Sequence, residues 1–293
     1  MKRVFLFLVT NIAIVVMLGI VASLLGINNY VSSQGIDFKN LLLFALFFGF
    51  AGSFISLLIS KKMAKWTMSL TMIDGTEGPT ERWIYGVVEK MAQEKGIKMP
   101  EVSIYDSPEM NAFATGPSKN NSLVALSTGL LRNMNKDEVE AVIGHEVAHI
   151  ANGDMVTLTL VQGVVNTFVI VASRVVAFAL EKFINRGDDD ESEGQSWIYH
   201  LSVIVFDIVF GILASMIVAY YSRVREFAAD QGGAELKNKQ AMINALRKLG
   251  QQTPGNLPEA VKSFGISGRT SSFLALFSTH PPIEKRIEAL ENA

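Results

Sequence analysis

Four long apolar segments constrain this chain most, because roughly 20 apolar residues of helix suffice to span the hydrocarbon core of a bilayer. They run from about Val4 to Ile27, Leu41 to Ile59, Met155 to Ile184 and Trp197 to Tyr221. The chain is 49% hydrophobic and 18% charged, whereas soluble proteins average about 25% charged residues. We therefore expect all four segments to be transmembrane helices.

Three of these segments have a second interpretation. The first is similar to a signal peptide, but it is long for one and lacks a small-x-small cleavage site, so it is interpreted as a retained anchor. The third and fourth segments contain Gln162, Asn166, Arg174 and Asp207, which is also compatible with amphipathic helices packed on a soluble domain. The acidic loop at 188–191 between them favours a hairpin that spans the membrane, with the loop outside.

The positive charges predict the orientation, because Lys and Arg are enriched in cytoplasmic loops. With four spans, one side of the membrane receives Lys2, Arg3, Lys61, Lys62, Lys65, Arg223 and Arg225. That side is therefore predicted to be cytoplasmic. The expected organisation is a transmembrane hairpin at 1–60, a first cytoplasmic part at 61–154, a second hairpin at 155–221 and a second cytoplasmic part at 222–293.

Two charges within the second hairpin match in depth. Arg174 and Asp207 each lie about ten residues from the outer ends of their spans, and charges at that depth are costly and usually paired. An Arg174–Asp207 ion pair is predicted to hold the hairpin together. Alternatively, Arg174 extends to the outer interface alone.

The two cytoplasmic parts predict a small α+β fold. Strands are expected at Glu101–Asp106, Asn111–Thr115 and Ser122–Ser127. Helices are expected from Thr80, as N-cap, to Lys95; from Asn135 to Asn152; through Arg223 to Leu236; from Lys239 to Leu249; and after Pro281-Pro282. Asn135 and Glu138 have the spacing of a capping box. The fold class is thus an α+β membrane protein, with four transmembrane helices and a mostly helical cytoplasmic domain that contains a small sheet.

The sequence His145-Glu146-Val147-Ala148-His149 carries the chemistry. Residues four apart share one face of a helix, so both imidazoles can bind one cation. Glu146 lies beside the first ligand, where a carboxylate can take a proton from a water that zinc has activated. This is the H-E-x-x-H pattern of zinc proteases, and Glu146 is the predicted general base.

A catalytic zinc site needs a third protein ligand. His200 lies near the outer end of the fourth span, on the wrong side of the membrane. Glu226 is the better candidate, because an antiparallel hairpin brings it close to His145 and His149. Asp230, four residues later, is expected to bind the far nitrogen of a ligand histidine. The alternative is that both carboxylates pair with Arg223 or Arg225 on a solvated helix.

These motifs resemble those of the HtpX family of bacterial heat-shock membrane proteases, which is related to the CaaX prenyl endopeptidases. The resemblance covers nearly the whole chain and includes the paired N-terminal spans. Its motifs are Asn111–Gly116, His145–His149 with Asn152-Gly153-Asp154, Arg223–Asp230 and Thr279-His280-Pro281-Pro282. It implies a zinc-dependent endopeptidase of the inner membrane that degrades damaged or misassembled membrane proteins during stress.

Further residues are candidates for the site. An edge strand formed by Asn111, Ala112, Phe113 and Ala114 can bind a substrate backbone by strand addition, or it can be a buried strand or a turn. His280 is a candidate oxyanion donor, a fourth zinc ligand in a resting state, or neither. Arg223 is a candidate for orienting Glu226 or the substrate. Asp154 is expected to cap the third span rather than to act in catalysis.

Composition and setting limit the alternatives. A net charge of -2 gives no indication of nucleic-acid binding. The absence of cysteine excludes Cys-ligated zinc and disulfides. An intramembrane-cleaving protease is disfavoured, because charged residues precede His145 on its helix. A non-catalytic, zinc-stabilised quality-control adaptor is disfavoured, because such a site needs no Glu146.

The expected partners are the lipid bilayer and membrane-protein or unfolded substrates. A second copy of the chain and other quality-control proteases are further candidates.

Overall fold

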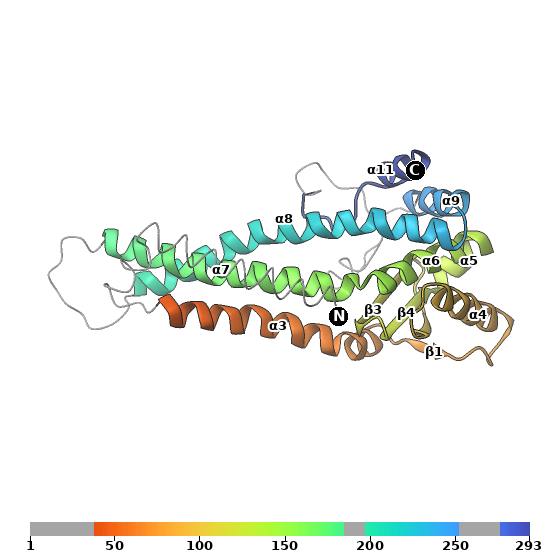
Figure 1. The fold of residues 1–293 in the computed structure, drawn as a ribbon, viewed down its shortest axis with the longest axis horizontal. Helices are drawn as coiled ribbons and strands as arrows, with labels where there is room; N and C mark the ends of the chain where they lie inside the picture. Colours follow the sequence, from red (N-terminus) through yellow and green to blue (C-terminus); the bar gives the residue numbers. More distant parts are fainter. Residues whose placement is uncertain (1–37, 185–196, 252–275) are drawn as a thin grey trace. The chain divides into compact units, whose positions relative to one another are not determined.

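The computed structural model describes residues 38–184, 197–251 and 276–293 (Figure 1). Within these ranges, three helices are long and apolar enough to cross a membrane: α3 (Phe38–Thr67), α7 (Asp154–Ile184) and α8 (Trp197–Leu236). They correspond to the second, third and fourth predicted spans. The first predicted span, Val4–Ile27, and the acidic loop at 188–191 lie outside the described residues, so four spans stay a prediction.

The described chain is divided into two compact units. One contains residues 38–54, 159–184 and 197–215, and the other contains 55–158, 216–251 and 276–293. Helices α3, α7 and α8 each contribute residues to both units. The division of the chain into hairpins at 1–60 and 155–221 and cytoplasmic parts at 61–154 and 222–293 stays a prediction.

Within the first unit, α7 lies close to α3. The hydroxyl of Thr167 donates to the backbone oxygens of Ala45 (3.3 Å) and Gly163 (2.9 Å). A methyl group at Gly49 would lie 2.4 Å from Thr167 Oγ1. Small residues at such contacts let the backbones of membrane helices approach closely. In lipid, where no hydrophobic force drives helices together, this close packing stabilises their association.

The predicted pair between α7 and α8 is confirmed in the same unit. Arg174 Nη1 lies 3.5 Å from Asp207 Oδ1, and the hydroxyl of Ser173 donates to the same oxygen. Arg174 also donates to the carbonyl of Ile170 (3.1 Å). The Arg174 side chain is therefore paired, which disfavours the alternative in which it extends to the interface alone.

In the second unit, a four-stranded mixed sheet has the order β1-β2-β4-β3. The strands are β1 (Thr71–Ile73), β2 (Glu101–Tyr105), β3 (Ala112–Ser118) and β4 (Asn121–Ser127). Only the β2–β4 pair is parallel. Three strands were predicted with small differences at their ends, whereas β1 was not, because three residues carry too little periodicity to indicate a strand.

Helices cover this sheet. Helix α4 (Pro79–Glu94) has Gly78 as its N-cap, two positions before Thr80, so the prediction of Thr80 as the cap was wrong. Proline at the first helical position explains the difference, since its fixed φ and missing N–H suit that position. The short helix α5 (Thr128–Asn133) was also not predicted; Ser127 caps it by accepting from Leu130 N.

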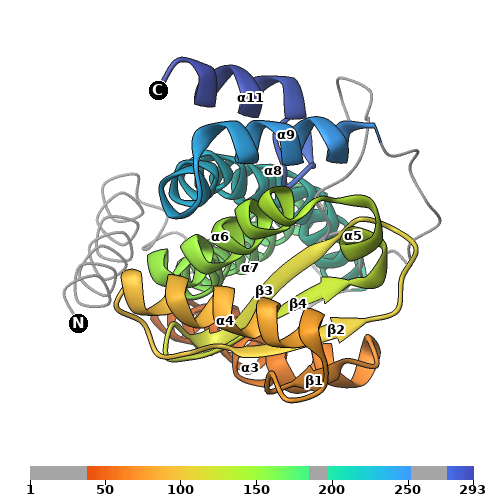
Figure 2. The same ribbon diagram turned by 90° about the vertical axis from the view of Figure 1, so that its right-hand side faces the viewer.

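Helix α6 (Lys136–Asn152) is the centre of the second unit. Its predicted capping box between Asn135 and Glu138 is present, and Gly153 ends the helix in the left-handed conformation, with φ 69°. Figure 2 shows α6 between strands β3 and β4 on one side and α9 (Lys239–Gly250) on the other, with α11 (Ile283–Glu291) beyond α9. The core around α6 is apolar and fully buried, and includes Val124, Leu126, Val142, Ile143, Val147 and Leu246. This packing fixes the helix that carries the predicted metal ligands.

Candidate metal centre

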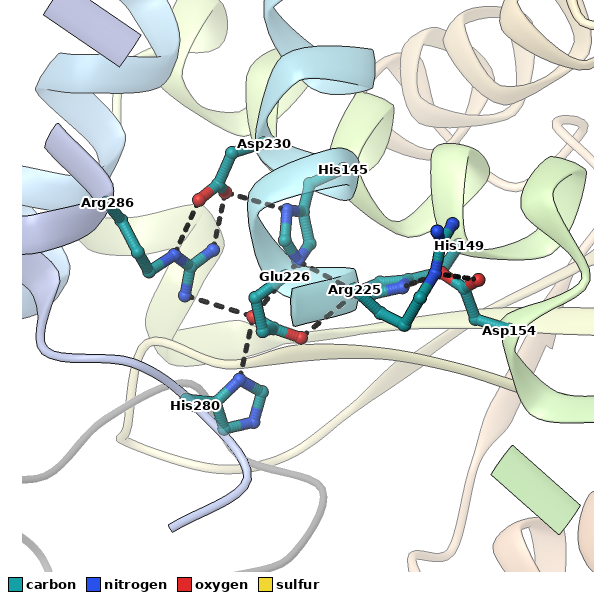
Figure 3. Close-up of polar contacts among 8 residues, drawn as sticks. All are labelled: His145, His149, Asp154, Arg225, Glu226, Asp230, His280 and Arg286. Atoms are coloured by element: carbon teal, nitrogen blue, oxygen red, sulfur yellow. Dashed lines mark hydrogen bonds and ion pairs between the residues drawn. The ribbon is translucent and has the colours of Figure 1, made fainter. Parts of the chain in front are cut away.

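Two histidines on α6 face the same point (Figure 3). His145 and His149 are one helical turn apart, and their Nε2 atoms are 3.1 Å apart. His145 is 2% exposed, and Glu146, which follows it directly, is also buried. The helix thus places two imidazole nitrogens close enough to share a cation, with a carboxylate next to them.

Helix α8 supplies the third member of the cluster. Glu226 is buried, with Oε1 3.2 Å from His149 Nε2 and Oε2 3.7 Å from His145 Nε2. Zinc bonds of 2.0–2.1 Å in a tetrahedral site separate neighbouring ligand atoms by roughly 3.3 Å. The three distances in this site are close to that separation, so the residues present fit a divalent ion such as zinc.

Small residues let α8 approach α6 closely enough for Glu226 to reach the histidines. A methyl group at Gly232 would lie 2.5 Å from Ala148 Cβ, and one at Gly233 would lie 3.0 Å from the His145 backbone nitrogen. Ala148 lies between the two histidines in sequence. The Gly232-Gly233 pair therefore sets the distance between the two helices that carry the cluster.

A carboxylate oxygen lies close to the far nitrogen of each histidine. Asp230, one helical turn after Glu226, lies with Oδ1 3.0 Å from His145 Nδ1, as predicted. Asp154 lies with Oδ2 2.8 Å from His149 Nδ1. Such partners orient the ring and direct Nε2 toward the metal. The sequence favoured Asp154 only as a cap for the following helix, and its contact with His149 is a role that this interpretation missed.

Arg223 and Arg225 have other partners than the alternative expected, in which one of them neutralises Glu226 and Asp230. Arg225 Nε donates to Asp154 Oδ1 (2.6 Å). Arg223 Nη1 donates to the carbonyl oxygens of Leu276 (3.0 Å) and Ser278 (2.7 Å). Arg223 thus holds the chain segment that leads to His280, which is an indirect link to the site.

Arg286 on α11 is the cation that contacts both carboxylates. It donates from Nε and Nη2 to the two oxygens of Asp230, at 2.7 and 2.5 Å, and its Nη1 lies 3.2 Å from Glu226 Oε2. Sequence reasoning missed this residue. A signal was present, because Arg286 shares the apolar face of its helix with Ile283, Ile287 and Leu290, and an arginine at such a position needs a buried partner.

His280 also reaches the cluster. Its Nδ1 lies 2.8 Å from Glu226 Oε2, and its own carbonyl accepts from the hydroxyl of Ser278 (2.8 Å). Glu226 Oε2 is therefore close to both His280 and Arg286. This contact leaves His280 Nε2 available for a further ligand.

These contacts change the pKa values of the ionisable groups in the site. Burial raises the pKa of Glu226, but the charges of His280 and Arg286 outweigh it and hold that pKa well below its usual range. Burial likewise opposes ionisation of Asp230, yet Arg286 lowers its pKa. For His149, burial lowers the pKa, and the carboxylates of Asp154 and Glu226 reverse this and raise it to about 10. The lowered pKa values keep Glu226 and Asp230 ionised at neutral pH.

The proposed substrate strand lies at the edge of the sheet. Asn111 precedes β3, and its backbone oxygen accepts from Ser127 N (2.9 Å). Inter-strand hydrogen bonds alternate along an antiparallel pair, so the backbone groups of Ala112 and Ala114 point away from β4. The Asn111 side chain is 4% exposed, and its amide atoms find no hydrogen-bond partner within the described part of the chain.

Known proteins resemble this chain over its whole length. The model of peptidase family M48 matches residues 79–293. The Protease HtpX homolog of Variovorax paradoxus (strain S110) is 58% identical over 294 residues, covering 100% of both chains. The Protease HtpX homolog of Albidiferax ferrireducens (strain ATCC BAA-621 / DSM 15236 / T118) is 55% identical, covering 100% of this chain and 99% of its own.

A solved structure gives the same picture of the fold. S. mikatae Ste24p superimposes with a TM-score of 0.63 at 17% sequence identity, over 97% of this chain and 66% of that chain. At this identity the likeness shows the fold alone.

Proposed function

The chain belongs to peptidase family M48, and on that premise we propose that it is a zinc-dependent endopeptidase of the bacterial inner membrane. Its proposed substrates are the cytoplasmic regions of damaged or misassembled membrane proteins, and unfolded polypeptides. The observation that carries the proposal is the cluster of His145, His149 and Glu226, whose ligand atoms lie within 4.8 Å of one another. A lone H-E-x-x-H sequence lacks the third ligand, whereas here a separate helix supplies it.

The residues have distinct proposed roles. His145, His149 and Glu226 hold the metal, which when bound polarises the scissile carbonyl and lowers the pKa of water. Glu146 accepts the proton of the attacking water on its carboxylate and passes it to the leaving amine. Asp230 and Asp154 keep the two ligand histidines oriented through their Nδ1 atoms.

Substrate binding is proposed at the edge of the sheet. The outward backbone groups of Ala112 and Ala114 pair with an extended substrate, and Asn111 and Phe113 flank them on β3. His280 donates from Nε2 to the oxyanion of the tetrahedral intermediate. Its Nδ1 contact with Glu226 Oε2 (2.8 Å) supports this role, because it holds the ring beside the metal ligands.

Two other functions are less well supported. An intramembrane-cleaving protease carries its histidines within a spanning helix, but α6 is not among the long apolar helices and begins with the exposed residues Lys136 and Asp137. A non-catalytic adaptor would need the metal ligands but no Glu146. The orientation toward the cytoplasm, a second copy of the chain and other quality-control proteases as partners remain part of the proposal.

The decisive experiment compares the purified wild type with Glu146→Gln and Glu226→Ala in detergent, on an unfolded protein substrate. Glu146→Gln is expected to keep its zinc and to lose roughly 10²–10⁴-fold in rate, because it removes only the proton acceptor. Glu226→Ala is expected to lose most of its zinc, measured by metal analysis. Full activity of Glu146→Gln would exclude the proposed mechanism, and full zinc content of Glu226→Ala would exclude Glu226 as a ligand.

A further inference from the structure

Arg286 extends from the last helix, α11, into the proposed metal centre (Figure 3). The residue is 1% exposed. Its guanidinium binds both oxygens of Asp230 and reaches Glu226 Oε2 (3.2 Å). One rigid group therefore contacts the proposed ligand Glu226 and the carboxylate that orients the proposed ligand His145.

The geometry of this contact suits only arginine. A guanidinium is planar and presents its N–H groups as a fixed fork, so the two bonds to Asp230 also fix the direction of Nη1. A lysine ammonium has the charge but no fork and forms no such paired geometry. The position of Glu226 relative to Asp230 thus depends on the shape of the Arg286 side chain as well as on its charge.

We infer that Arg286 is a positioning residue that sets the metal affinity by holding Glu226 and Asp230 in one fixed arrangement. This inference rests on the proposed function of the same site. Glu226 Oε2 contacts Arg286 and His280, at 3.2 and 2.8 Å, whereas Oε1 lies 3.2 Å from His149 Nε2. Arg286 and His280 thus both contact Oε2, which lies 3.7 Å from His145 Nε2, while Oε1 is the oxygen nearer to a histidine. Glu226 is therefore expected to bind a metal mainly through Oε1.

Two effects of Arg286 on metal affinity oppose each other. Its positive charge repels a divalent ion, while its hydrogen bonds to Asp230 and its ion pair with Glu226 orient the two carboxylates. Asp230 neutralises much of the charge through its paired contact at 2.7 and 2.5 Å. Orientation is therefore expected to dominate, and removal of such partners typically costs 10–100-fold in metal affinity.

The test uses the full-length protein in detergent, with Arg286→Met, Arg286→Lys and the control Arg247→Met. Arg247 links α9 to the same last helix through Glu291 (3.1 Å) but is half-exposed and lies outside the site. Zinc affinity is measured by competition with a chelator, and the visible spectrum of the Co²⁺-substituted protein reports the ligand geometry. The spectrum of the bound Co²⁺ reports the ligand geometry itself, so a loss of general stability, which can lower the measured affinity, does not by itself change it.

Arg286→Met is expected to lower zinc affinity about 10–100-fold and to change the Co²⁺ spectrum. Arg286→Lys is expected to recover part of the affinity, while its spectrum stays altered, because the charge returns without the fork. Arg247→Met is expected to match the wild type in both readouts. Its activity should also be unchanged.

The inference is overturned if Arg286→Lys has the wild-type affinity and spectrum, and this variant decides the matter even if Arg286→Met fails to fold. An equal loss in Arg247→Met would also overturn it, since the effect would then come from docking of α11. Neither outcome would contradict the proposed protease function, which Glu146→Gln and Glu226→Ala test separately.

Discussion

At the scale of single residues, each proposed metal ligand has a partner that holds it. Asp230 binds His145, Asp154 binds His149, and Arg286 with His280 binds Glu226. Burial alone would favour neutral carboxylates, but the opposite charges outweigh it, and the pKa of Glu226 and Asp230 are lowered. The carboxylates of Glu226 and Asp230 are thus kept ionised, and the proposed ligands are kept in the orientation that a divalent ion requires.

Asp154 offers a test at this scale. His149, with its pKa raised to about 10, is protonated at neutral pH before a metal binds, and the metal must replace that proton. Zinc affinity is therefore expected to rise about tenfold per pH unit between pH 7 and 9. Asp154→Asn removes the main hydrogen bond that raises this pKa, so proton competition weakens and the pH dependence should flatten. Because the ring also loses the partner that orients it, zinc affinity corrected for proton competition should fall about 10–100-fold.

Titration calorimetry at several pH values, with protons released counted from the buffer dependence, measures both effects. Asp137→Asn serves as the control, because Asp137 is an exposed carboxylate on the same helix, paired with Lys237 (2.7 Å). An unchanged pH dependence in Asp154→Asn would contradict the role given to this carboxylate.

At the scale of elements, the site depends on how closely α6 and α8 pack. The two histidines come from α6, Glu226 and Asp230 come from α8, and Gly232 and Gly233 permit the contact. The capping box and Gly153 fix the two ends of α6. A change in the distance between these helices moves Glu226 away from the two histidines, without changing any of the proposed ligands.

Gly232→Ala tests this dependence. The added methyl would lie 2.5 Å from Ala148 Cβ, a group that cannot rotate away, so the helices must separate. Overpacking of this kind costs about 1–3 kcal/mol, and it should lower zinc content as well as the melting temperature. The control is Gly86→Ala on α4, where the methyl meets nothing within 4 Å and should stabilise the helix by about 0.5–1 kcal/mol.

The two variants are compared by denaturant unfolding and metal analysis. If Gly232→Ala kept both full zinc content and wild-type stability, the close approach of α6 and α8 would not set the site.

At the scale of the whole molecule, the question is on which side of the membrane the second unit lies. The positive residues that flank the apolar segments predict the cytoplasm. Since the chain has no cysteine, single cysteines can be introduced without a background. Glu89→Cys, exposed on α4, should react with a membrane-impermeant maleimide only after the inner membrane is permeabilised. Asp190→Cys, in the acidic loop, should react in cells with only the outer membrane opened.

Labelling of both positions from the same side would contradict the predicted orientation. It would mean that the chain crosses the membrane an even number of times between residues 89 and 190, whereas the predicted topology has one crossing there. The protease assay is independent of this result.

Much of the local structure was determined by the sequence itself. Apolar length indicated the helices α3, α7 and α8, helical spacing placed His145 and His149 on one face, and the Asn135–Glu138 spacing marked the start of α6. These features depend on residues a few positions apart, so periodicity and capping chemistry reveal them. The antiparallel hairpin also allowed Glu226 and Asp230 to be predicted near the histidines.

Only the tertiary structure decided the remaining contacts of the site. Asp154 and Arg225 are 71 positions apart, and Asp230 and Arg286 are 56 apart. No local pattern specifies which of several arginines a buried carboxylate meets, because that choice depends on how α6, α8 and α11 pack. The spacing in the sequence determined which residues are proposed to bind the metal, whereas the fold determined the charges that hold them in place.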